Sequence, residues 1–294
     1  MKLDKIKFNK DKLNLCQVSL KGNIPIIIEN HRKLKLFYKD FNIFIICPKK
    51  DLNLFKKKLK YSEFIIISED QILSFSKFQK IFYKLSKKYK FKTLFKKRLS
   101  WYYQQILKLA FVFYFLKKNN KRIILWDADT VITKKINFFS GDFSSKFGTF
   151  TEFHKSYFEI NKVLLGQIPK YFISSVVQFG SITSFESKIL MKKLKIKGNK
   201  INEIANNLST LIMREIFLMD ASYNGSLFSE YELIGNFKIL IKPEKQNMIA
   251  SLRKGLKGIL SSKQLYFLNL LNITNVTYEH THKNTNSMGM LKRR

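Results

Sequence analysis

The chain has 294 residues, 45% of them hydrophobic and 15% aromatic, which is enough for the core of one α/β domain or of two small ones. It carries 55 Lys and Arg against 21 Asp and Glu, a formal net charge of +34 that favours anions: nucleic acid, an anionic membrane or a phosphorylated substrate. Two cysteines, Cys16 and Cys47, are too few for a disulfide framework or a cysteine-based zinc site and favour a reducing cytoplasm.

The first 15 residues are basic but lack the apolar stretch of a signal peptide. The longest nearly apolar run, 106–116, is too short to cross a bilayer. We therefore expect a soluble protein, or one that lies against a membrane surface without crossing it.

Short apolar runs alternate with longer helical ones over the first 130 residues, which is typical of an α/β protein with a largely parallel sheet. The segment 24–41 fits either a helix, which Pro25 would begin, or a strand. The strands expected in this half are 15–20, 42–48, 64–70 and 122–126.

The sequence WYYQQILKLAFVFYFLKKNN predicts a helix over 101–120, capped by Ser100 and closed by Asn119 and Asn120. The second half of the chain is less regular. Its expected segments are a loop at 140–150, a strand with a glycine break at 171–183, mostly helix over 185–219, and further elements at 228–237, 238–243 and 275–282. No linker rich in Pro, Gly or Ser and no internal repeat divides the chain, so a single domain is the simpler organisation.

The apolar run RIILW ends in two aspartates one residue apart, Asp127 and Asp129. Ligands favour the carboxyl ends of strands in open α/β sheets. Residues i and i+2 of extended chain share a face, so both carboxylates can turn toward one point. Two such carboxylates repel each other unless a cation lies between them, and Mg²⁺ or Mn²⁺ prefers oxygen ligands of this kind. The sequence therefore predicts a site that binds a metal ion and a diphosphate. The alternative is a turn whose two carboxylates are exposed to solvent.

A second clue lies in the preceding helix, where Gln104 and Lys108 are four residues apart and share a face. Lys108 is the one charge among about a dozen apolar neighbours, and an unpaired ammonium group is costly to bury. Either its amine reaches water, or it meets an anion: an internal ion-pair partner such as one of the aspartates, a phosphate of a sugar nucleotide, or the site around the metal.

Three blocks, SWYYQQILKL, IILWDADTVI and FSEYELIGNF, together resemble glycosyltransferases of the GT-A fold. They are most similar to a bacterial branch with a W-Y-x-Q-Q-x-x-K helix before D-x-D and an S-E-Y-E stretch after it. The resemblance covers roughly 12–285. It implies a GT-A-like (Rossmann-like) α/β/α sandwich with a mostly parallel central sheet. The whole chain, 1–294, would be one catalytic domain, with 12–130 as the nucleotide-sugar-binding half, 131–285 as the acceptor-binding half and 286–294 as a basic tail.

The activity that the resemblance implies is transfer of a sugar from a nucleotide-sugar, with a UDP-sugar favoured, to a hydroxyl of a saccharide or glycolipid acceptor. Mn²⁺ or Mg²⁺ would bridge the aspartates and the diphosphate. Asp129 would be the principal metal ligand, and Asp127 would contact ribose or a water-bridged metal. Gln104, Gln105 and Lys108 would lie near the donor. The implied setting is surface polysaccharide or lipooligosaccharide synthesis in the bacterial cytoplasm or at the inner face of the membrane.

An inverting enzyme of this kind needs a base for the acceptor hydroxyl, and a retaining enzyme does not. Glu230 and Glu232 are the candidates, with Glu230 favoured; the alternative is a pair of ordinary acids at a helix start. His280 or His282, with His280 favoured, would be a further metal ligand by resemblance, and a polar surface strand is the alternative. The remaining expected site residues are Arg98, Trp101 and Tyr102 near the donor, and Ser174, Ser175 and Gln178 in an acceptor cleft.

Two other functions also fit parts of the sequence. A haloacid-dehalogenase-type phosphatase would use D-x-D-x-T, but it needs a later acidic pair, and only Asp142 and Asp220 follow Asp129. A non-enzymatic protein that binds anionic polymer or membrane would explain the charge. The abundance of Lys, Ile, Asn and Phe also has a purely compositional explanation, and the lack of a zinc finger, RNP-like or KH-type segment argues against a nucleic-acid partner.

Overall fold

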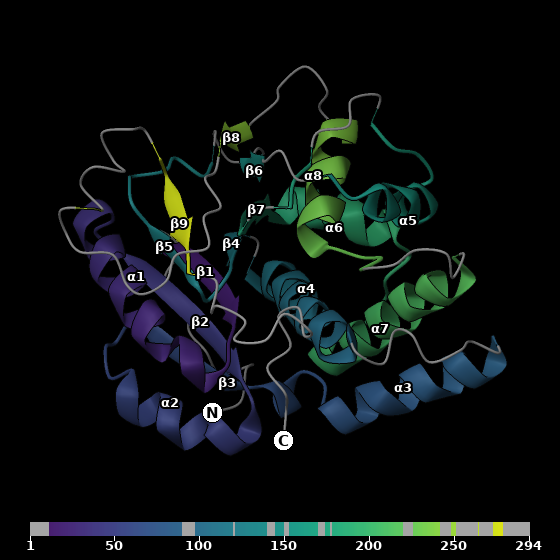
Figure 1. Ribbon diagram of the computed structural model, residues 1–294, viewed down its shortest axis with the longest axis horizontal. Helices are drawn as coiled ribbons and strands as arrows, with labels where there is room; N and C mark the ends of the chain where they lie inside the picture. The colour runs from purple at the N-terminus through teal and green to yellow at the C-terminus, as the bar shows by residue number, and fades with distance from the viewer. Residues whose placement is uncertain are drawn as a thin grey trace.

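The computed structural model describes residues 12–89, 98–119, 121–139, 145–149, 153–169, 174–176, 178–219, 226–241, 248–250, 264 and 273–278. Its centre is a seven-stranded sheet in the order β3-β2-β1-β4-β7-β6-β8, and β5 and β9 pair in a small second sheet (Figure 1). The strands are β1 (Leu13–Val18), β2 (Phe41–Cys47), β3 (Phe64–Ser68), β4 (Arg122–Trp126), β5 (Thr130–Ile132), β6 (Phe147–Thr149), β7 (Phe179–Thr183), β8 (Met248–Ala250) and β9 (Asn275–Thr277).

The four strands of the first half, β3, β2, β1 and β4, are mutually parallel, as the alternation of strands and helices predicts. The strand β7 runs antiparallel to both β4 and β6, whereas β6 and β8 are parallel. The main sheet is therefore mixed and mostly parallel, and the α/β fold class is confirmed.

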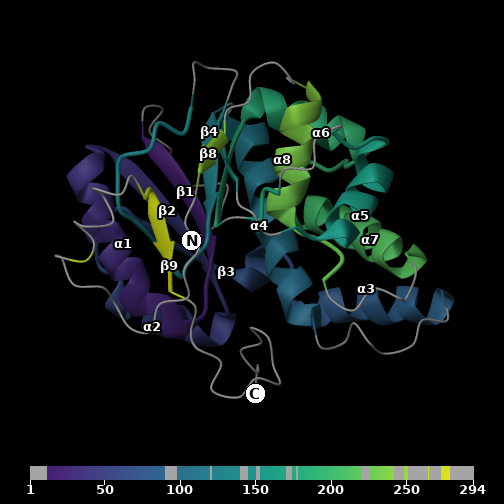
Figure 2. The same cartoon turned by 45° about the horizontal axis from the view of Figure 1, so that its top comes forward.

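Helices cover both faces of the sheet, so the molecule has three layers (Figures 1 and 2). One face packs against α1 and α2, and the other packs against α4, behind which α7 and α3 form an outer layer. The helices are α1 (Ile24–Phe37), α2 (Leu52–Lys58), α3 (Phe75–Lys88), α4 (Leu99–Asn119), α5 (Lys155–Leu165), α6 (Ser184–Lys193), α7 (Ile201–Leu218) and α8 (Glu230–Ile241).

The central helix α4 is apolar on nearly all sides because it lies between the sheet and other helices. Its buried positions include Lys108, which lies about two and a half turns before Lys117, the first basic residue of its last turn. No helix in the described part of the chain is long and apolar enough to span a membrane.

Several predicted boundaries differ from the structure. The ambiguous segment 24–41 is helical to Phe37, and the chain then turns into β2 at Phe41. Ser100 is not the cap of the long helix, since α4 already begins at Leu99. The two elements expected at 228–237 and 238–243 are one helix, α8, because the apolar positions continue through it to Ile241.

His31 on α1 is buried among aromatic side chains, and we expect it to make the stability of the fold depend on pH. His31 is 1% exposed, and its ring stacks on Tyr61 at 4.4 Å and contacts Phe64 at 4.7 Å, while its Nε2 lies 3.4 Å from an oxygen of Glu63. Burial lowers the pKa of His31, and this outweighs the opposite effect of Glu63.

We predict that His31 lowers stability as the pH falls through the ordinary histidine range. The unfolded chain takes up the proton first because its histidine pKa is higher, so the contribution of neutral His31 is complete above about pH 6.5 and is lost below it. Thermal melts of wild type and His31→Phe between pH 8 and 5.5 check this. The melting temperature of wild type should fall relative to the variant as the pH is lowered; a constant difference would contradict the assignment.

Candidate active site

The two aspartates after β4 lie in a tight turn, not in extended chain. The backbone N–H of Thr130 donates to the Asp127 carbonyl at 3.1 Å, and the Trp126 indole N–H donates to the Thr130 carbonyl at 2.9 Å. The expectation that 127–129 is extended is therefore wrong, because the chain turns there to form β5 outside the main sheet.

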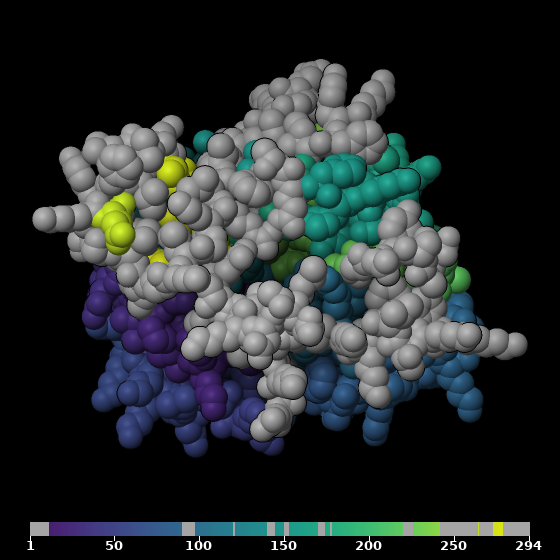
Figure 3. Space-filling view, viewed as in Figure 1, coloured from purple at the N-terminus to yellow at the C-terminus, as the bar shows by residue number. Residues whose placement is uncertain are grey.

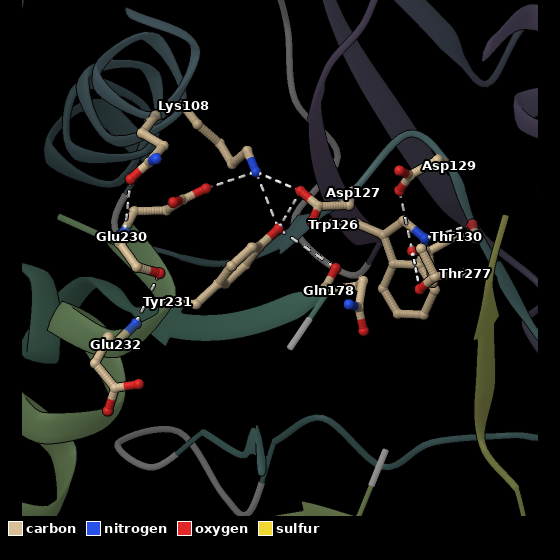
Figure 4. A network of polar contacts seen from close by, with 12 residues as sticks. Lys108, Trp126, Asp127, Asp129, Thr130, Gln178, Glu230, Tyr231, Glu232 and Thr277 are labelled. Atoms are coloured by element: carbon tan, nitrogen blue, oxygen red, sulfur yellow. Dashed lines mark hydrogen bonds and ion pairs between the residues drawn. The ribbon is translucent and has the colours of Figure 1, made fainter. Parts of the chain in front are cut away.

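Neighbouring segments hold this turn on both sides. The Asp127 N–H donates to the Gln178 carbonyl at 2.8 Å, just before β7, and the Tyr278 N–H donates to the Asp129 carbonyl at 2.7 Å, just after β9. The side chains separate accordingly: Asp127 points toward α4 and α8, whereas Asp129 lies on the side of Thr130 and β9 (Figure 4). The turn thus places one carboxylate in each direction at the carboxyl end of β4.

The ammonium group of Lys108 is the centre of a buried network (Figure 4). Its Nζ donates to Asp127 Oδ1 at 2.7 Å, to Glu230 Oε1 at 2.7 Å and to Tyr231 Oη at 3.0 Å. Burial alone would lower the pKa of Lys108, but Asp127 and Glu230 together raise it above its usual value, so the group stays charged. Of the roles that the sequence left open for Lys108, the structure shows the internal ion pair. All three N–H bonds are used within the protein, so direct contact with a phosphate would require one of them to be given up.

Tyr231 is a member of this network that the sequence did not single out. Its hydroxyl donates to Asp127 Oδ1 at 2.7 Å, and its ring lies 4.6 Å from Lys108 Nζ. The ring packs next to Gly180 in β7, where an added Cβ would lie 3.4 Å from Tyr231 Cδ1, an ordinary van der Waals contact. The signal in the sequence was a tyrosine between two acids, which does not reveal a partner 104 residues away.

Glu230 is buried, at 3% exposure, at the first position of α8. Gln105 from α4 accepts a hydrogen bond from its backbone N–H at 3.1 Å, and this satisfies one of the free N–H groups of the helix start. Burial raises the pKa of Glu230 against the opposing effect of Lys108. The structure therefore brings Gln105 and Glu230 together with Lys108 and Asp127, while Gln104 lies half-buried one turn before Lys108.

Glu232 points away from this network (Figure 4). Its carboxylate accepts hydrogen bonds from Ser174 Oγ at 3.1 Å, from the Ser175 N–H at 3.0 Å and from Asn236 Nδ2 at 3.2 Å. It is fully buried, and burial raises its pKa to about 7. Ser174 and Ser175, expected in an acceptor cleft, are buried and bind Glu232, so their place in this structure is an anchor between 174–176 and α8.

Asp129 is half-buried, and its carboxylate accepts a bond from Thr130 Oγ1 at 3.4 Å. Burial, and next the negative charge of Asp127, raise the pKa of Asp129 to about 7. If Asp127, Asp129 and Glu230 are all ionised, three negative charges face the single positive charge of Lys108. Because the pKa values of Asp129 and Glu230 are both raised, uptake of protons by these two groups offsets part of this negative charge.

The remaining predicted residues lie outside this cluster or outside the described residues. Arg98 lies just before α4, with its guanidinium group 5.9 Å from the indole ring of Trp101 in the first turn of that helix, and Trp101 is about 10 Å along the helix from Lys108. Tyr102 is buried and accepts a hydrogen bond from the Leu227 N–H at 3.1 Å. His280 and His282 lie outside the described residues, within which no group of three or more His, Cys, Asp or Glu could hold a metal ion.

The sequence analysis also missed Gln17, near the carboxyl end of β1 and beside β4. It is fully buried, and neither atom of its amide has a hydrogen-bond partner in the described part of the molecule. A buried amide without partners is costly, which makes Gln17 a candidate for ligand contact. The signal in the sequence is that Gln17 is a polar residue between two apolar neighbours, Cys16 and Val18.

We predict that Lys108→Met destabilises the protein by about 3–5 kcal/mol, because it leaves Asp127 and Glu230 as neighbouring carboxylates without a counter-charge. Urea unfolding of the variant measures this. The matched control is Lys118→Met, an exposed lysine of the same helix, which should change stability by less than about 0.5 kcal/mol. Adding Glu230→Gln to Lys108→Met should recover part of the loss, and a single variant as stable as wild type would argue against the ion-pair network.

Gly235 brings α8 against the segment 174–176. A Cβ at this position would lie 1.9 Å from Ser175 Oγ and 2.4 Å from Ser175 Cβ. We therefore predict that Gly235→Ala destabilises by about 1–3 kcal/mol, although alanine ordinarily favours a helix over glycine.

Thermal melts compare this variant with Gly22→Ala, whose added Cβ would have no atom within 4 Å and should be tolerated. The double change Gly235→Ala with Ser175→Gly removes the clashing atoms and should restore stability. If Gly235→Ala were as stable as wild type by itself, the close approach of the two segments would be refuted.

No family model and no curated protein matches this chain. Among solved structures, it is similar to mouse xyloside xylosyltransferase 1 in its apo form, with a TM-score of 0.38 and 11% identity over 94% of this chain and 99% of that one. It is also similar to the galactosyltransferase LgtC in complex with donor and acceptor sugar analogs, with a TM-score of 0.35 and 7% identity over 94% of this chain and 92% of that one. Neither similarity is strong enough to carry an argument about function.

Proposed function

We propose that this protein is a metal-dependent glycosyltransferase that moves a sugar from a nucleotide-sugar, with a UDP-sugar favoured, to a hydroxyl of a saccharide or glycolipid acceptor. The observation that supports this most is the carboxylate turn Asp127–Ala128–Asp129 at the carboxyl end of β4, where Asp127 is ion-paired with Lys108 and Asp129 has no ion-pair partner among the described residues. The motif resemblance of the blocks around Lys108, Asp127 and Glu230 agrees with it, since these three residues form one network.

The residues present fit a hard divalent cation such as Mn²⁺ or Mg²⁺. Within the described residues, the hydrogen bonds to the Asp127 carboxylate all go to Oδ1, so Lys108 and Tyr231 fix this side chain and leave its second oxygen as the candidate ligand atom. Asp129 supplies the other carboxylate. When bound, the metal would supply a Lewis acid that stabilises the negative charge of the departing nucleoside diphosphate.

The third protein ligand that we propose is His280, with His282 as the alternative. Tyr278 is hydrogen-bonded to the backbone of Asp129, and two residues of chain span at most about 7 Å. A histidine two residues further on is therefore within reach of the turn.

For the other groups we propose positioning and donor roles. Glu230 holds Lys108, which holds Asp127; because Glu230 is buried and already ion-paired, we assign it to positioning rather than to proton transfer. Glu232 anchors 174–176, on the side where we place the acceptor. Gln17, which has no partner for its amide in the described structure, is our first candidate for contact with the donor, and Gln104, Arg98 and Trp101 remain further candidates.

We predict that Asp129→Asn abolishes Mn²⁺-dependent turnover of the nucleotide-sugar, by a factor of about 10² or more, while the melting temperature without metal stays near wild type. A screen of nucleotide-sugars for Mn²⁺-dependent hydrolysis identifies the donor first, and calorimetry with Mn²⁺ and UDP measures binding. The matched control is Asp70→Asn, an exposed acid at the end of β3, which should leave both unchanged. Full turnover by Asp129→Asn would eliminate the metal assignment.

A further inference from the structure

The segment from Gln71 to Trp126 contains 13 Lys and 2 Arg but no Asp or Glu. Fifty-six residues without an acid are unusual even in this basic chain, which has 21 acids in its 294 residues. A biased base composition of the genome would explain the abundance of lysine, but it does not by itself explain a long segment without Asp or Glu. This segment begins just before α3 and ends with β4.

The helix α3 presents this charge on one side only. Its other side packs into the molecule: Phe78 lies 5.3 Å from Tyr103 of α4, and Phe82 lies 5.2 Å from Phe217 of α7. The exposed side, which we term the α3 lysine face, consists of Lys77, Lys80, Tyr83, Lys84, Lys87 and Lys88.

The positive charge of the α3 lysine face is not neutralised by the protein. None of its five amines forms an ion pair with a described residue, whereas Lys35, Lys49 and Lys155 elsewhere on the surface each have an acidic partner. The helix lies at the lower right of the molecule in Figures 1 and 2, and blue atoms mark this region at the lower right of Figure 3. Its exposed amines are therefore available to an anionic partner.

One exposed aromatic side chain accompanies these lysines. Tyr83, in the middle of the α3 lysine face, is 47% exposed. Lysine stems can cover apolar surface while their amines stay with lipid phosphates, and a tyrosine among them can place its ring at the level of the headgroups.

We propose that the α3 lysine face docks the protein on an anionic lipid bilayer. A bilayer is favoured over nucleic acid because the face has no arginine and no exposed Asn or Gln for reading bases. The proposal is independent of the sugar transfer proposed above, since it uses none of the residues around Asp127.

The test is co-sedimentation of the full chain with vesicles of phosphatidylcholine, alone or with about one third phosphatidylglycerol, at low salt. Binding is expected only with phosphatidylglycerol, and it should be lost by ~0.5 M salt, where charges are screened within a few ångströms. The triple variant Lys77→Gln, Lys80→Gln, Lys84→Gln should bind at least about tenfold more weakly. Tyr83→Ser should also weaken binding, which a purely electrostatic attraction would not require.

The matched control removes the same charge from α6, at the opposite edge of the helical layer in Figures 1 and 2, through Lys188→Gln, Lys192→Gln, Lys193→Gln. All six lysines are exposed, so both variants should melt like wild type, and both should keep donor turnover in solution. Equal losses in the two variants, no binding to anionic vesicles, or tighter α3-dependent binding to duplex DNA would each overturn the proposal.

Discussion

The ion pairs of Lys108 are the interaction on which the arrangement of the site depends. A single ammonium group joins the centre of α4, the turn after β4 and the first residue of α8. Burying three charges is favourable only when their geometry is good and their other hydrogen-bonding groups are satisfied. Tyr231 adds a hydrogen bond to Asp127, and Gln105 accepts one from the Glu230 backbone, so elements far apart in the sequence are joined around Asp127.

The same network leaves the site short of positive charge. Lys108 offsets one of the three carboxylates, and its N–H groups are already directed at protein atoms. The raised pKa of Asp129 reflects burial first and the charge of Asp127 second. The repulsion within the turn therefore comes from the fold itself, and either a proton or a bound cation would relieve it.

Local sequence patterns predicted much of this fold but little of the connectivity within the site. The strand 122–126 was predicted at its observed bounds because a buried run ends sharply in aspartates, and the long helix was predicted to within two residues at its start. The turn at 127–129 was missed because its geometry comes from hydrogen bonds to the segments before β7 and after β9. Likewise, periodicity shows that Lys108 is buried but not that its second partner is Glu230, 122 residues away, and the two acids of S-E-Y-E look equivalent until the structure separates them.

The helix α8 contacts two separate parts of the molecule. The Tyr231 ring lies beside Gly180 of β7, and Gly235 lets Ser175 approach the helix one turn later. Through the first contact α8 reaches Asp127, and through the second Glu232 holds the segment 174–176. Because one helix makes both contacts, α8 links the segment 174–176 to the hydrogen-bond network around Asp127.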